Sequence, residues 1–252
     1  MYVRKTRILL ILLFTTIAVL SAASIGDLKI IILRVEFIPD TYVGTSGDGT
    51  FLLENNDDNC SIYTIDPPPH NKSYFESQLI AIDSYFRSVS KGQFGIDLNN
   101  SAVYPDGSEV AYTLPDSMAF YHPFLSDIPV DEITRIHEER LVSLFKDAVE
   151  VAYAVDNLDF SEYDLIVVIH AGVSQDFDFS SISGIPEPAQ EDIPSTYIDH
   201  RMVTEFIGNG GIQIGGNTIE HGIILPETQN HLFYPEMVDY LDNFADVCDF
   251  QF

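Results

Sequence analysis

The chain has 252 residues, which is enough for one domain with a sizeable hydrophobic core. It carries 39 acidic against 12 basic side chains, and its formal net charge of −27 at pH 7 would repel nucleic acid phosphates and anionic membranes. The 17 Phe and 13 Tyr residues are far more than a disordered acidic tail would contain. Composition therefore predicts a folded, strongly acidic domain and excludes nucleic acid as a partner.

Residues 1–23 have the pattern of a secretory signal peptide. Three basic residues precede the apolar run 8–20, and Ser-Ala-Ala follows at 21–23. Because the run is short for a ~20-residue membrane span, we favour cleavage after Ala23 over a retained anchor. We expect a secreted or extracellular protein, with the periplasm as the alternative. Its mature domain would cover residues 24–252 and have no stable membrane span.

The first predicted strand covers residues 29–37, KIIILRVEF, which are apolar and β-branched enough for a sheet covered on both faces. Residues 38–72 lack periodicity and contain glycine, Asn/Asp and proline clusters, so they predict a long loop. Carboxylates and amides of this loop could hold calcium, although the pattern of an EF-hand is absent. A solvated loop without calcium is the alternative.

A helix is predicted over residues 73–89, followed by a strand at 94–98. Apolar residues recur in the helix at steps of three and four, as in a helix packed on a core: Phe75, Leu79, Ile82, Phe86 and Val89. Ser73 lies three residues before Glu76, which predicts a capping box at the helix start. Residues 90–92 break the helix, and apolar residues then alternate with others as in a strand.

Further elements follow in the middle of the chain. Turn residues at 105–108 predict either a hairpin between 103–104 and 110–113 or a strand that leads into a loop. Residues 131–155 have the apolar periodicity of a second helix. The uniformly apolar residues 165–169 predict a strand in the centre of the sheet.

The last predicted elements are short strands. Residues 195–198 form one strand, and residues 212–214 and 218–225 form two more about the glycine turn at 215–217. Cys60 and Cys248 are the only cysteines. In an oxidising compartment a disulfide between them would stabilise the fold by about 4 to 5 kcal/mol in the chain-entropy model. A Cys248 that is unpaired, or bonded to a partner outside this sequence, is the alternative.

Several short pieces resemble, in order, the region upstream of the active site in secreted zinc metallopeptidases of the immune inhibitor A family. The resemblance covers roughly residues 29–227. It implies an α+β fold, specifically a zincin-like N-terminal subdomain with a twisted mixed sheet and two backing helices. The matching pieces are Tyr85 to Phe94, Val103-Tyr104-Pro105, Tyr112-Thr113-Leu114-Pro115, Tyr121-His122, Asp159 to Asp164 and His170-Ala171-Gly172.

In that family the chemistry depends on a zinc ion held by a helix bearing His-Glu-x-x-His, and this motif is absent from the sequence. We therefore assign no catalytic and no metal-binding residue, and expect zinc only in a complete family enzyme. The resemblance places one segment in an edge strand along the substrate cleft, with an ordinary edge strand as the alternative. That segment consists of Ile219, Glu220, His221, Gly222 and Ile223.

Two functions are consistent with these sequence features. The first is the front portion of a secreted zinc metallopeptidase-like protein, ending before its zinc-binding helix and inactive alone. Its partner would be a peptide or protein substrate if a downstream segment completed it. The second is a non-catalytic acidic binding module or pseudoenzyme, with calcium as its candidate ligand. Whether the chain belongs to an enzyme is thus undecided by the sequence.

Overall fold

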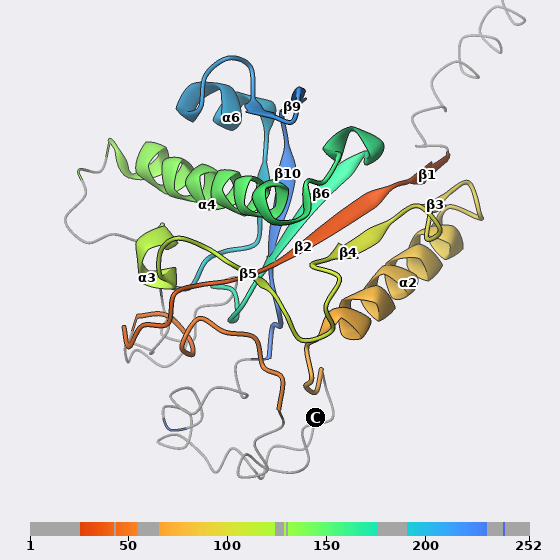
Figure 1. Ribbon diagram of the computed structural model, residues 1–252, viewed down its shortest axis with the longest axis horizontal. Coiled ribbons are helices and arrows are strands. Elements are labelled where there is room, and N and C mark those ends of the chain that lie inside the picture. Colours follow the sequence, from red (N-terminus) through yellow and green to blue (C-terminus); the bar gives the residue numbers. More distant parts are fainter. Residues whose placement is uncertain are drawn as a thin grey trace, which may run out of the picture.

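The computed structural model describes residues 26–42, 44–54, 66–123, 129, 131–175, 191–230 and 239. A mixed β-sheet with strand order β4-β2-β6-β10-β7 forms its centre, and β5 also pairs with β2 (Figure 1). The predicted signal peptide and both cysteines, Cys60 and Cys248, lie outside the described residues.

The sheet is parallel except at one edge. β2 (Ile30–Glu36) pairs in parallel with β4 (Ala102–Tyr104), β5 (Tyr112–Thr113) and β6 (Leu165–His170). β6 pairs in parallel with β10 (Gly222–Pro226), and β10 pairs antiparallel with β7 (Thr196–Ile198). Two small sheets accompany it: β1 (Gly26–Leu28) with β3 (Phe94–Ile96), and β8 (Ile212–Ile214) with β9 (Asn217–Ile219).

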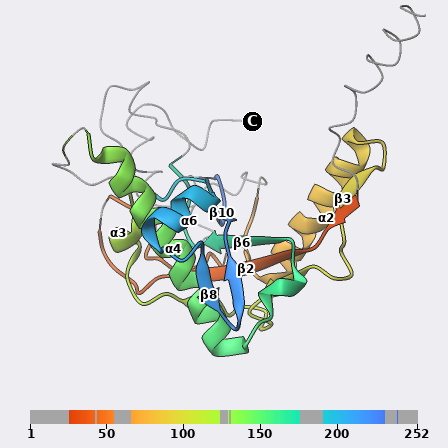
Figure 2. The same ribbon diagram turned by 90° about the horizontal axis from the view of Figure 1, so that it is seen from above.

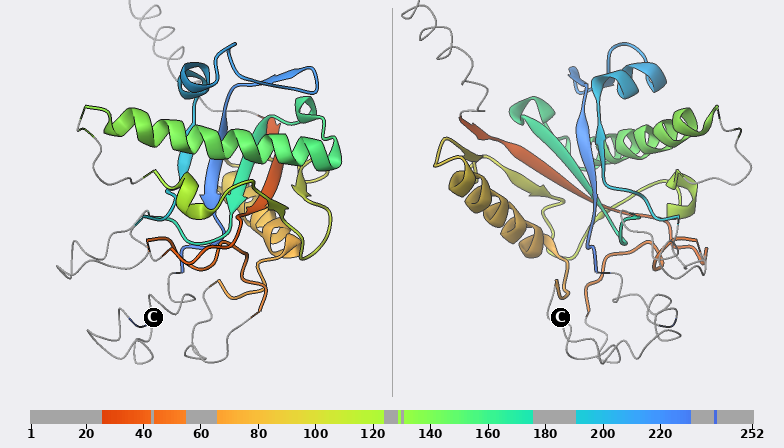
Figure 3. Two further views of the ribbon diagram at one scale, coloured as in Figure 1. Left: turned by 60° about the vertical axis from the view of Figure 1, so that its left-hand side comes forward. Right: turned by 180° about the vertical axis from the view of Figure 1, so that it is seen from behind.

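Two long helices cover opposite faces of the sheet, as Figures 2 and 3 show. They are α2 (Lys72–Val89) and α4 (Ile133–Asp156). The shorter helices are α3 (Met118–Tyr121), η1 (Phe160–Glu162) and α6 (His200–Phe206). This mixture of helices with a mixed sheet confirms the α+β part of the predicted fold class.

The sheet separates the core into two halves, and β6 is its central strand. This strand lies between β2 and β10, which confirms the prediction of a central strand at 165–169. Because side chains alternate along a strand, Val167 and Ile169 face α2 whereas Ile166 and Val168 face α4. On the α4 side the packing is tight: a Cβ atom on Gly222 would lie 2.3 Å from the ring of Phe145.

Two local predictions are wrong. The cap of α2 is Asn71 rather than Ser73, because the Asn71 side chain accepts a hydrogen bond from the backbone N–H of Tyr74 at 3.2 Å. Of the two alternatives for residues 103–113 the hairpin is wrong, since β4 and β5 both pair with β2 in parallel, and β4 leads into a loop instead.

The guanidinium of Arg34 explains the second difference. Arg34 is 1% exposed and donates to the carbonyl oxygens of Pro105 at 2.8 Å, Gly107 at 2.6 Å and Ser108 at 3.0 Å. These bonds hold the connecting turn against β2. Consequently β4 and β5 add to β2 one after the other, and neither folds back on the other.

The predicted glycine turn is confirmed, because β8 and β9 form an antiparallel pair on either side of residues 215–216. The strand predicted at 218–225 is, however, divided. Its first residues belong to β9, and the remainder forms β10 in the main sheet.

Candidate functional site

The five predicted cleft residues do not form an edge strand. Ile219 ends β9, Glu220 and His221 follow it, and Gly222 and Ile223 begin β10. β10 has β6 on one side and β7 on the other, so the predicted edge position is wrong. The sequence GIILP is apolar enough to be buried on both faces, which suits an interior strand.

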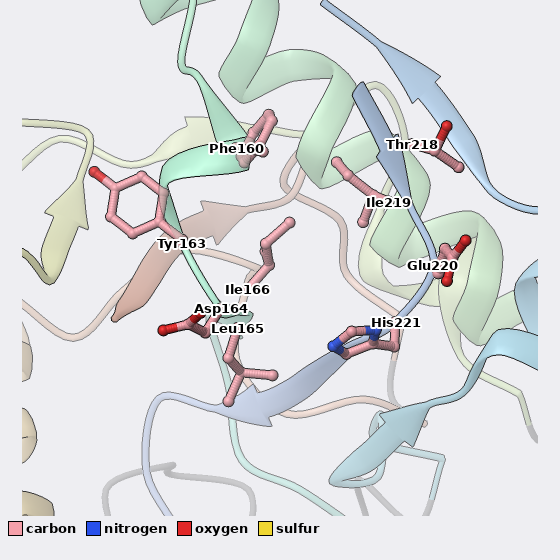
Figure 4. A pocket seen from close by; sticks show the side chains of 9 residues that line it. All are labelled: Phe160, Tyr163, Asp164, Leu165, Ile166, Thr218, Ile219, Glu220 and His221. Atoms are coloured by element: carbon pink, nitrogen blue, oxygen red, sulfur yellow. The ribbon is translucent and has the colours of Figure 1, made fainter. Parts of the chain in front are cut away.

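Three of these residues line a small pocket at the amino ends of β6 and β10 (Figure 4). Its volume is ≈ 150 Å³, below the roughly 300 Å³ at which ligand pockets usually begin. The side chains of Asp164 and His221 lie on opposite sides of this pocket. Asp164 accepts a hydrogen bond from the backbone N–H of Lys29 at 2.8 Å. That Ile219, Glu220 and His221 contact substrate therefore stays a prediction.

A buried polar cluster lies at the other end of the strands, around Glu227. Sites in sheets of parallel strands gather at the carboxyl ends of the strands, and Glu227 directly follows β10. Its side chain is fully buried. Oε1 accepts from the backbone N–H of Leu52 at 3.0 Å and lies 2.9 Å from Nδ1 of His70. Oε2 accepts from the backbone N–H of Gly172 at 3.1 Å.

His70 connects this carboxylate to the start of α2. Its Nε2 lies 3.0 Å from the carbonyl oxygen of Asp66. The carboxylate of Asp66 in turn accepts hydrogen bonds from the hydroxyls of Tyr74 and Thr228. The carbonyl oxygen of Asp66 can only accept, so Nε2 of His70 carries a hydrogen, and a second hydrogen lies between Nδ1 and Oε1 of Glu227, which makes the pair neutral as a whole.

The pKa directions agree with this assignment. Burial lowers the pKa of His70, but its hydrogen bond to Glu227 and the bond to the carbonyl of Asp66 oppose burial, and the net shift is upward. Burial raises the pKa of Glu227, and the hydrogen bonds from His70 and from the backbone of Leu52 and Gly172 only partly oppose it. The folded state therefore holds protons on this pair more tightly than the unfolded chain does.

Next to the cluster lies an apolar groove, defined as the space between α2 and the facing sides of β2, β6 and β10. Its volume is ≈ 560 Å³, within the range of about 300–1,000 Å³ typical of ligand sites. Apolar side chains line its body: Leu28, Ile30, Ile32, Phe75, Leu79, Ile82, Phe86, Phe94, Ile96, Leu165, Val167, Ile169, Ile223 and Leu225.

Polar groups line the groove at its carboxyl end, where Asp66, Tyr74, Glu227, Thr228 and Gln229 contribute. The sequence predicted the apolar stripe of α2 and the apolar strand β6. It gave no indication that a space remains between them. His70 was also missed, because it lies in an aperiodic loop 157 positions away from its partner Glu227.

Comparisons with protein-family models, curated proteins and solved structures found no match to this chain. The described residues contain no group of three or more His, Cys, Asp or Glu side chains that could hold a metal ion. Within the same ranges, no helix combines the length and apolar character needed to cross a membrane. The candidate site is thus the groove with its acidic, hydrogen-bonded end.

The His70–Glu227 pair should make stability depend on pH. The reference is a His70→Asn/Glu227→Gln double variant, in which a neutral amide pair replaces the two titratable groups. We expect the difference between the wild-type and variant melting temperatures to fall as the pH rises from 5 to 9. Both folded pKa values are raised, so the stabilisation is complete below the unfolded values and is lost as the pH rises through the folded ones.

The steepest fall should lie above pH ~6.5, the ordinary value for histidine. Each unit of pKa shift corresponds to about 1.4 kcal/mol, or roughly 3–6 °C for a domain of this size. Thermal melts followed by circular dichroism measure the difference. A difference that stays constant or rises with pH would contradict the assigned charge state.

Proposed function

We propose that this chain is the front portion of a secreted zinc metallopeptidase-like protein of the immune inhibitor A type. The supporting observation is the arrangement of the sheet. The resemblance implies a mixed sheet with two backing helices, and the observed sheet is parallel except for the antiparallel edge strand β7, with α2 and α4 on its two faces. Secretion is part of the proposal and depends on the leader pattern in residues 1–23.

Hydrolysis of the family type depends on a His-Glu-x-x-His helix, and this motif does not occur in the sequence. In a zinc peptidase the metal lowers the pKa of a bound water and a Glu accepts its proton. Two histidines must project from one face of a helix to hold that metal. The closest local pattern begins at His137 in α4, but one helical turn further on stands the buried Leu141. We therefore propose that the chain does not cleave peptides by itself.

Strand β7 provides a route for binding an extended peptide. Among the described strands, β10 is its one partner, and we propose that the outer backbone edge of β7 pairs with an extended peptide. Tyr197 lies in the middle of β7 and is 58% exposed. We propose β7 as the peptide-pairing edge, since β10 lies inside the sheet.

Tyr197 also adjoins the groove. It is directly opposite Ile223 in the antiparallel pair, and opposite residues of such a pair project from the same face. Ile223 lines the groove, so a peptide added to β7 would lie along the border of the groove. Peptide side chains on that face could enter it.

The alternative function is a non-catalytic binding module or pseudoenzyme. The ≈ 560 Å³ apolar groove favours it, because a binding role needs no metal helix. Calcium remains a candidate ligand through the loop that contains residues 55–59, which lie outside the described residues. A calcium-dependent rise in melting temperature would support such a site.

The catalytic part of the proposal is tested by metal analysis and a protease assay. The purified chain, incubated with Zn²⁺ and dialysed, should retain less than stoichiometric zinc and should leave casein intact. The assay is repeated with a chelator to identify metal-dependent activity. Stoichiometric zinc together with casein cleavage that the chelator abolishes would show that a reaction centre exists within these residues.

The peptide-binding part is tested with a pair of matched tyrosine variants. The ligand is an extended apolar peptide selected from a peptide array. Tyr197→Ala should weaken its binding by about threefold to tenfold, the usual loss for an exposed aromatic contact. Tyr85→Ala on α2 should leave the affinity unchanged, because Tyr85 is similarly exposed, at 63%, and does not line the groove. Fluorescence anisotropy gives both affinities. Equal effects of the two variants would exclude β7 as the binding edge.

A further inference from the structure

The groove between α2 and the sheet has the properties of a site for a small amphiphile. We propose that it binds a molecule with an elongated apolar body and a polar end that is positively charged or neutral, such as a long-chain amine or alcohol. The proposal is independent of whether the chain derives from a metallopeptidase.

The size of the groove is the first observation. The groove has a volume of ≈ 560 Å³ and a mainly apolar lining, which is enough space for the body of a small apolar ligand. Eight apolar or aromatic residues of its lining are only partly buried: Leu28, Tyr74, Phe86, Phe94, Leu165, Ile223, Leu225 and Pro226. An apolar ligand would remove their remaining surface from water.

The shape of the groove is the second observation. One wall is the apolar stripe of α2, which runs from Phe75 to Phe86, and the other is formed by the strands. Along β6 the lining extends from Leu165 to Ile169, four residue steps, which correspond to roughly 13 Å of strand. An elongated chain fits this space better than a compact ring system.

The charge at the carboxyl end of the groove is the third observation. Asp66 and Glu227 are the charged residues of the described lining, and both are acidic. His70, which pairs with Glu227, does not line the groove. The carboxylate of Asp66 already accepts from Tyr74 and Thr228, and a carboxylate has about four acceptor positions. An ammonium or hydroxyl group can use a remaining position.

The same charges select against other ligands. A fatty acid would place its carboxylate next to Asp66, and like charges in a partly desolvated site repel each other strongly. An amine of the same length is attracted by Asp66, whereas the charge of Glu227 is offset by its partner His70. The groove should therefore distinguish two amphiphiles that differ only in the sign of the charged end.

The experiment uses the purified chain at pH 7 and the neutral fluorescent probe N-phenyl-1-naphthylamine. Decylamine, decan-1-ol and decanoate compete with the probe below the concentrations at which they form micelles. Decylamine and decan-1-ol should displace it, and decanoate should bind at least about tenfold more weakly than decylamine because of charge repulsion. Decylamine should also raise the melting temperature of the wild-type chain.

Three variants locate the site. Asp66→Asn should reduce the preference for decylamine over decanoate to about twofold, since it removes the acidic group whose charge His70 does not offset. Ile223→Phe combined with Leu225→Phe fills the groove and should weaken all ligands at least about tenfold. Val110→Phe is the matched control, because Val110 is 57% exposed and lies outside the groove; its ligand affinities should equal those of the wild type.

Circular dichroism verifies that each variant is folded. If a variant does not fold, two wild-type measurements test the proposal instead. They are the ratio of the affinities for decylamine and decanoate and the melting-temperature shift with decylamine. The proposal is overturned if decanoate binds as tightly as decylamine, or if filling the groove leaves the affinities unchanged. It is also overturned if sedimentation shows that a second copy of the chain occupies the groove and excludes the probe.

Discussion

The buried carboxylate of Glu227 joins the parts of the molecule that would otherwise be separate. It accepts hydrogen bonds from Leu52 in the long loop and from Gly172 after β6, and it pairs with His70 just before α2. A carboxylate placed in this position without partners would cost several kcal/mol of desolvation. With its partners in place, the carboxyl ends of β6 and β10, the loop and the helix start are held together at one point.

This point determines where α2 lies and, with it, the groove. Asn71 caps the helix immediately after His70, and Tyr74 in its first turn is bonded to Asp66. The start of α2 is therefore fixed against the end of β10. Further along, the helix and the strands diverge enough to leave the apolar space between them. The polar end of this space carries the acidic residue Asp66, and the chain as a whole is also strongly negative.

Much of the fold could be predicted from residue patterns, because periodicity reports which side of an element is buried. The helices α2 and α4 and the uniformly apolar β6 form where expected, but of the predicted α2 stripe only Phe75 and Leu79 are buried, whereas Ile82 and Val89 are exposed. Neighbour relations could not be predicted in the same way. Whether β7 or β10 lies at the sheet edge depends on pairings between segments that are distant in the sequence. Similarly, the path of the turn at 105–108 depends on its long-range hydrogen bonds with Arg34.

The candidate site was less accessible to sequence reasoning. His70 and Glu227 belong to no motif, and their contact spans most of the domain. The one available indication was a carboxylate directly after an apolar strand, a position at which sites in parallel sheets occur. The residues that the sequence did indicate lie instead at the opposite ends of the strands, around a pocket of ≈ 150 Å³.

Amide hydrogen exchange measured by NMR tests the role of Glu227 most directly. If its carboxylate joins the loop and the sheet, the amides of Leu52 and Gly172 should exchange about as slowly as the amide of Val168 in the core of β6. In a Glu227→Ala variant these two amides should lose protection while Val168 keeps it. Rapid exchange of Leu52 and Gly172 in the wild-type chain would contradict the account.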